Sequence, residues 1–135
     1  MTAELLARSL VKQARQRLDL LPYAMKTEAW HIVIREAQEC VELALKGLLR
    51  SCGLEPPKIH DLGEFLLENR NRIARERATL PLERLAEIST RLRKERELSF
   101  YGEIDFIPDE AYSQTQAEGA IRDAIFCVEQ AEAML

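Results

Sequence analysis

The sequence predicts an all-α protein, an up-and-down bundle of four to five helices. Apolar residues make up 47% of the chain and charged residues 31%, while glycine and proline number only five each. This composition favours long helices over a β architecture rich in turns. Apolar residues also recur at spacings of three and four over four long segments, which is the period of an amphipathic helix. Because 135 residues suit one core, we expect a single helical domain over residues 1–135.

The first two helices are expected at residues 3–21 and 27–52. Pro22 should end the first, because proline breaks the hydrogen-bond ladder, and Gly53 should end the second. The residues expected to face inward from the first helix are Ala3, Leu6, Leu10, Ala14, Leu18 and Leu21. Those expected to face inward from the second are Trp30, Val33, Ala37, Val41, Ala44 and Leu48.

A short third helix should follow, with Asp61 as its N-cap and Glu64 as the capping-box partner. The Arg-rich stretch of residues 69–79 has few apolar side chains and separates it from the fourth helix. Thr79 is expected to cap that helix and Pro81 to be its first residue. Its inward stripe should be Leu85, Ile88 and Leu92.

Periodicity lapses between residues 100 and 112, where the sequence reads as an aromatic and acidic loop. Thr115 and Glu118 then have the spacing of a capping box and should begin the last helix. The residues expected to face inward from this helix are Ala117, Ile121, Ala124, Ile125, Val128 and Ala131.

Composition and motifs also exclude several classes of protein. A net charge of −4 argues against a surface devoted to nucleic acid, although a local basic patch is compatible with it. No apolar run is long enough to span a membrane, and the charged N-terminal stretch is unlike a signal peptide, so we expect a cytoplasmic protein. The three cysteines lack any C-x-x-C pairing, and the single E-x-x-H at Glu28 and His31 has no second copy. We therefore expect no disulfide, no metal and no cofactor.

Arg96 is the first candidate site residue, because helical phase places it within about 40° of Leu92 on the inward stripe. It either lines a cleft shared with the loop that follows or is a solvated residue at the helix end. Tyr101 could approximate a general acid or base, although a phenol accepts protons poorly near neutral pH, or it packs the loop onto the bundle. The neighbouring Arg91, Arg93 and Lys94 either steer phosphate groups or form an ordinary solvated face.

Two stretches of the sequence form a recognisable pattern. The first is AQECVELALKGLL at residues 37–49, which contains Glu42 and Lys46 four residues apart and is followed by a linker and the tripeptide His60-Asp61-Leu62. The second is LRKERELSFYG at residues 92–102. In this order the two stretches resemble the HEPN domain family. Without the family resemblance, the spacing of Glu42 and Lys46 indicates simple helix stabilisation. His60 is then either a structural linker residue or a ligand contact.

The resemblance implies a five-helix bundle that is often a homodimer and often the partner of a minimal nucleotidyltransferase in a toxin–antitoxin-type pair. Many members of the family are metal-independent ribonucleases that carry R-x4-6-H at a cleft between two subunits. This chain departs from that motif, because Tyr101 stands where the histidine would follow Arg96. We therefore do not expect ribonuclease activity by the usual pair.

We accordingly expect a partner protein with a groove for nucleotide or RNA, contacted by Arg91, Arg93, Lys94 and His60. In this interpretation Arg96→Ala weakens association with nucleotide or RNA. The alternative is a metal-independent ribonuclease toxin with a degenerate active site, formed by Arg96 and Tyr101.

Overall fold

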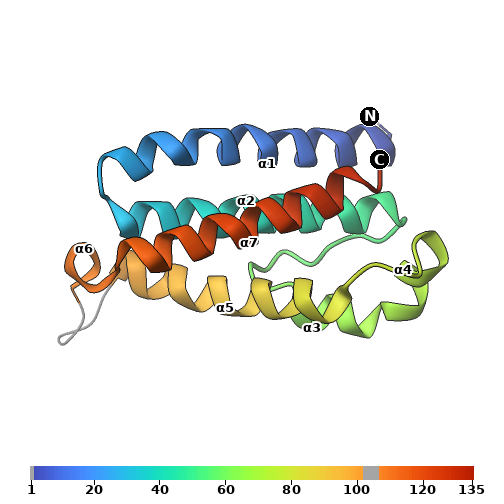
Figure 1. Ribbon diagram of the computed structural model, residues 1–135. Helices are drawn as coiled ribbons and strands as arrows, with labels where there is room; N and C mark the ends of the chain where they lie inside the picture. Colours follow the sequence, from blue (N-terminus) through green and yellow to red (C-terminus); the bar gives the residue numbers. More distant parts are fainter. Residues whose placement is uncertain (1, 102–106) are drawn as a thin grey trace.

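Four long helices run up and down side by side (Figure 1). The computed structural model describes residues 2–101 and 107–135, without the side chains of residues 98–101. The described residues form helices and no strands, which confirms the predicted all-α bundle. The long helices are α1 (Ala3–Lys26), α2 (Trp30–Ser51), α5 (Leu82–Tyr101) and α7 (Gln114–Glu132). The short ones are α3 (Gly63–Glu68), α4 (Arg70–Glu76) and α6 (Pro108–Ala111).

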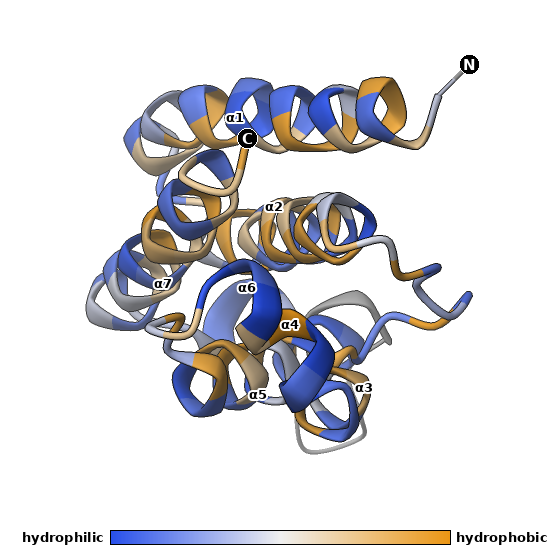
Figure 2. Cartoon of the chain, turned by 90° about the vertical axis from the view of Figure 1, so that its right-hand side faces the viewer, coloured by the Kyte–Doolittle hydropathy of each residue, from blue (hydrophilic) through white to orange (hydrophobic). Residues whose placement is uncertain are grey.

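Helix α2 is the centre of the bundle and packs against α1, α5 and α7. Figure 2 shows it between these helices, with largely apolar colouring. Its predicted inward stripe is confirmed, although Trp30 is only partly buried; the fully inward residues are Val33, Ala37, Val41, Ala44 and Leu48. Because three helices surround it, α2 buries most of its circumference, and the polar side chains that it carries inward need partners.

Helix α1 is longer than predicted, because Pro22 does not end it. Pro22 lies on the exposed side of the helix, and one further turn follows to Lys26. The predicted stripe is correct in the C-terminal half of α1. In the N-terminal half the buried residues are Ala7 and Val11 rather than the predicted leucines.

The predicted start of α2 at residue 27 is wrong, because Glu28 adopts a left-handed backbone with φ 57° and α2 begins only at Trp30. Its end is as predicted: Gly53, with φ 76°, follows the last turn.

The capping box predicted for the third helix is also wrong. Asp61 instead accepts hydrogen bonds from the Gly63 backbone N–H and the Thr90 hydroxyl, both at 2.9 Å.

The Arg-rich stretch after α3 is itself partly helical and forms α4, which the sequence did not predict. A single apolar residue, Ile73, is fully buried there and holds the turn against the core. Thr79 is not the cap of the next helix, because α5 begins at Leu82 and the Pro81 carbonyl accepts from the Leu85 N–H.

Helix α7 begins earlier than predicted, with a capping box formed by Ser113 and Gln116 rather than by Thr115 and Glu118. Its apolar face is otherwise close to the prediction. Ile125 is 37% exposed and Ile121 is only partly buried, whereas Ala120 and Cys127, which were not predicted to face inward, are buried.

The connection between α2 and α3 runs back along α2 (Figure 1). At its start, Arg72 Nε donates to the Cys52 carbonyl at 3.0 Å. At its end, the Leu62 N–H donates to the buried Ser89 hydroxyl at 2.9 Å. This fixed linker brings His60 beside the middle of α2.

Candidate functional site

Arg96 continues the apolar stripe of α5 and points toward α2. Its Nη1 donates to Gln38 Oε1 at 2.6 Å and to Glu39 Oε2 at 2.7 Å, and its side chain is only 20% exposed. The predicted inward orientation is therefore confirmed, and the solvated-end interpretation is wrong. Most of the loop predicted to share its cleft, residues 102–106, lies outside the described residues.

Glu42 joins the side chains around it into one cluster, which we call the Glu42 network: Gln38, Glu42, Lys46, His60 and Arg96. The carboxylate accepts from His60 Nδ1 at 2.6 Å, from Lys46 Nζ at 2.9 Å and from Gln38 Nε2 at 3.2 Å. Arg96 Nη1 lies 4.0 Å from the oxygen that His60 contacts. Gln38 therefore links Arg96 to Glu42 through the two ends of its amide.

The charge of Glu42 is set by two opposing effects. Burial alone would raise its pKa, since only 9% of the side chain is exposed. Hydrogen bonds from Lys46, His60 and Gln38 outweigh burial, and the net pKa lies below its ordinary value. Glu42 is thus a buried carboxylate that is held ionised by its partners.

This network is what sequence reasoning missed. The spacing of Glu42 and Lys46 was interpreted as simple helix stabilisation, and their ion pair does exist. The larger role of Glu42 depends on His60, which is eighteen residues away, and on Arg96, which is far along the chain. The tripeptide beginning at His60 was the one local signal of this arrangement.

The predicted basic cluster on α5 divides into members with and without partners. Arg91 donates to Glu87 at 2.7 Å and to Asp123 on α7 at 2.6 Å. These bonds raise its pKa above the ordinary value. Arg91 therefore holds α5 to α7. Arg93 and Lys94 have no ion pair with any described residue.

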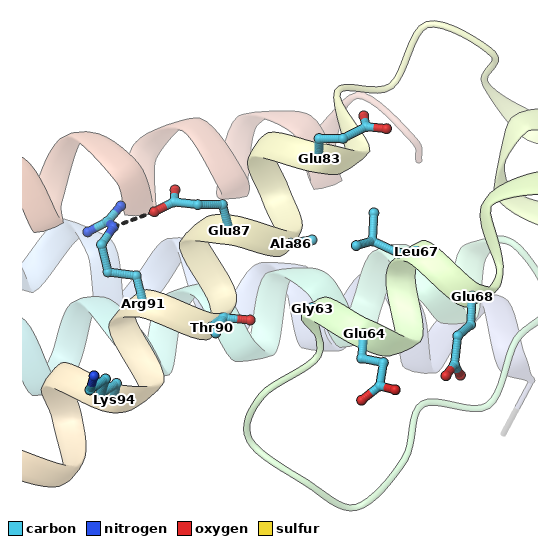
Figure 3. Close-up of a pocket in the computed structure, with 10 residues that line it drawn as sticks. All are labelled: Gly63, Glu64, Leu67, Glu68, Glu83, Ala86, Glu87, Thr90, Arg91 and Lys94. Carbon is cyan, nitrogen blue, oxygen red and sulfur yellow. Dashed lines mark hydrogen bonds and ion pairs between the residues drawn. The ribbon is translucent and has the colours of Figure 1, made fainter.

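Lys94 and Arg91 lie at one end of an open groove of about 850 Å³ between α3 and α5. Figure 3 shows Leu67 of α3 pointing toward Ala86 of α5 across this groove. Its rim is largely acidic and is formed by Glu64, Glu68, Glu83 and Glu87. The structure does not bring Lys94 together with His60, which lines a separate cavity.

Tyr101 is the last residue of α5, and its side chain lies outside the described residues. Another tyrosine anchors the far end of the predicted aromatic loop. Tyr112 is buried, and its hydroxyl donates to the Glu95 carbonyl at 3.0 Å. Burial raises the pKa of this phenol far above its ordinary value, so Tyr112 stays protonated.

The cysteines pack as small hydrophobic residues. All three are free and buried, and burial raises the pKa of the Cys40 and Cys127 thiols to about 12. Among residues 2–101 and 107–135, no three His, Cys, Asp or Glu side chains are grouped so as to hold a metal ion.

The family model of the HEPN domain matches residues 7–134, which is nearly the whole chain. This chain belongs to the HEPN domain family. No curated protein and no solved structure matches it. Within the described part of this HEPN domain, no helix is long and apolar enough to cross a membrane.

Proposed function

We propose that this HEPN domain is a binding module, the partner of a minimal nucleotidyltransferase in a toxin–antitoxin-type pair. It acts as a homodimer and contacts nucleotide or RNA through basic side chains. Family membership supports the homodimer, since HEPN domains commonly dimerise.

The observation that carries this proposal is the pattern of charge on α5. Arg96 is held internally by Gln38 and Glu39, while Arg93 and Lys94 have no ion pair with any described residue. Helix α5 thus supplies positive charge but carries no imidazole. Such a site favours holding a phosphate over removing a proton from a ribose hydroxyl.

The groove between α3 and α5 supports the partner part of the proposal. Leu67, which lines it, is 40% exposed, and Ala86 lies opposite. An apolar floor with a charged rim is the usual anatomy of a protein interface. We therefore place the contact with the partner protein on this side of the bundle.

The RNA part of the proposal is tested on the two basic residues without ion pairs, because Arg96 is held internally. Arg93→Gln combined with Lys94→Gln should weaken binding of a labelled single-stranded RNA, measured by fluorescence anisotropy. Two lost phosphate contacts should make the plot of log K against log salt concentration shallower by about 1.4. Lys12→Gln, an exposed cation on α1, is the matched control and should leave affinity and slope unchanged. An unaltered affinity and slope in the double variant would refute the assignment.

A second function has one specific observation in its favour. Arg96 and His60 approach the same oxygen of Glu42, so an arginine and a histidine do meet, although not through the usual motif. The corresponding function is a metal-independent ribonuclease in which His60, rather than Tyr101, transfers the proton.

A further inference from the structure

A cavity of about 270 Å³ lies where the N-terminal half of α1 meets the end of α2 and the linker that follows. Its walls come from Leu6 and Leu10 of α1, from Lys46 and Arg50 of α2, and from the linker residues Pro56, Pro57, Lys58, Ile59 and His60. We call this cavity the basic pocket. It is separate from the groove between α3 and α5.

The polar residues of the basic pocket are all cationic or imidazole side chains. Lys46 has a carboxylate partner, Glu42, which lies behind the wall and does not line the pocket. Arg50 and Lys58 make no ion pair with any residue in the described ranges. In a chain with a net charge of −4, two cations without a carboxylate partner beside one small cavity favour an anionic ligand.

His60 is oriented for a ligand by the Glu42 network. Its Nδ1 donates to Glu42 Oε1 at 2.6 Å, because an ionised carboxylate can only accept. This bond fixes the ring and leaves the other nitrogen, Nε2, for a ligand. About half of the imidazole, 49%, is exposed, so a ligand can reach it.

The remaining walls are apolar and suit the non-phosphate part of a ligand. Pro57 lines the pocket with a rigid, partly exposed ring beside the buried Pro56, and the Ile59 side chain is 52% exposed. A phosphate alone would leave these surfaces uncovered. A ligand with a phosphate at one end and a flat, partly apolar group at the other matches both kinds of wall.

We propose that the basic pocket binds the phosphate of a nucleotide, with Arg50, Lys58 and Lys46 on the phosphate oxygens and the base or ribose against Pro57 and Ile59. The proposal takes its ligand class from the proposed function, but it depends neither on the partner protein nor on the basic residues of α5. The source of the nucleotide is either a free mononucleotide or the terminal phosphate of an RNA strand.

The test is isothermal titration calorimetry, in which the protein is titrated in turn with AMP, adenosine and inorganic phosphate. AMP should bind, while adenosine and inorganic phosphate should each bind at least tenfold more weakly, because each satisfies only one kind of wall. A short RNA with a 5′-phosphate, compared with the same RNA carrying a 5′-hydroxyl, identifies the source. A preference for the phosphorylated strand over AMP assigns the pocket to RNA ends.

Arg50→Gln and Lys58→Gln should each weaken AMP binding about tenfold. Lys12→Gln is again the control, and the melting temperature of each variant shows that the fold persists. The pocket assignment is overturned if neither AMP nor phosphorylated RNA binds. It is also overturned if their binding survives both substitutions. If RNA binding is lost in the Arg93→Gln, Lys94→Gln double variant but not in the pocket variants, the proposed function holds and the pocket assignment fails. The failure of the pocket assignment can therefore be distinguished from the failure of the proposed function.

Discussion

Glu42→Ala should lower the free energy of unfolding by about 3–5 kcal/mol, the range for breaking a buried ionic cluster from one side. The substitution removes the acceptor of three hydrogen bonds and leaves the ammonium group of Lys46, which is 21% exposed, without its carboxylate. Urea denaturation measures the change. Glu36→Ala on the same helix is the matched control, because the Glu36 side chain is 42% exposed in its ion pair with Arg17 and should contribute no more than about 1 kcal/mol. Equal effects of the two substitutions would contradict the network.

The same carboxylate should make stability depend on pH in a predictable direction. The pKa of Glu42 is lower in the folded protein than the ordinary value of 4.5, so the unfolded chain takes up the proton more readily. The contribution of ionised Glu42 to the free energy of unfolding is therefore complete above about pH 4.5. It is lost as the pH falls through the pKa of Glu42 in the folded protein. Glu42→Gln should remove this part of the acid sensitivity. Parallel losses of stability in wild type and Glu42→Gln would show that other carboxylates are responsible.

Gly47→Ala should destabilise the protein by about 1–3 kcal/mol, the usual cost of overfilling a packed interface. A Cβ at Gly47 would lie 2.6 Å from Val11 Cγ2 and 3.0 Å from the Ala7 carbonyl oxygen, so α1 and α2 would have to separate. Gly119→Ala in α7 is the matched control. The nearest atom to its Cβ is Arg122 Nη2 at 3.7 Å, and replacing a glycine inside a helix should stabilise by up to about 1 kcal/mol. Chemical denaturation of both variants should show opposite signs; a stabilised Gly47→Ala would contradict the close packing.

Features set by a single helix were predictable from the sequence. The spacing of Leu85, Ile88 and Leu92 fixed the phase of α5, and that phase placed Arg96 facing inward. Helix ends were less predictable, because several residues satisfy the same local rule. Ser113–Gln116 and Thr115–Glu118 both have capping-box spacing, and the structure uses the earlier pair. Pro22 shows that an exposed proline near a helix end costs too little to stop the helix.

The candidate site was less predictable because it depends on contacts between distant segments. The path of the linker decides whether His60 reaches Glu42, and that path is fixed by Arg72 and Ser89, which carry no local signal of this role. The sequence could identify Arg96 as inward but not its partners on α2. The basic pocket likewise needs α1, which no spacing in the linker reveals.

The central claim is that this HEPN domain binds RNA or nucleotide without cleaving it. The most direct measurement is incubation of the purified protein with a labelled single-stranded RNA in the absence of metal, with wild type, His60→Ala and Arg96→Ala compared side by side. The predicted result is RNA that remains intact, with wild type cleaving no faster than a buffer control. Cleavage by wild type that disappears in His60→Ala or Arg96→Ala would contradict the claim and establish the Arg96–Glu42–His60 arrangement as a ribonuclease site.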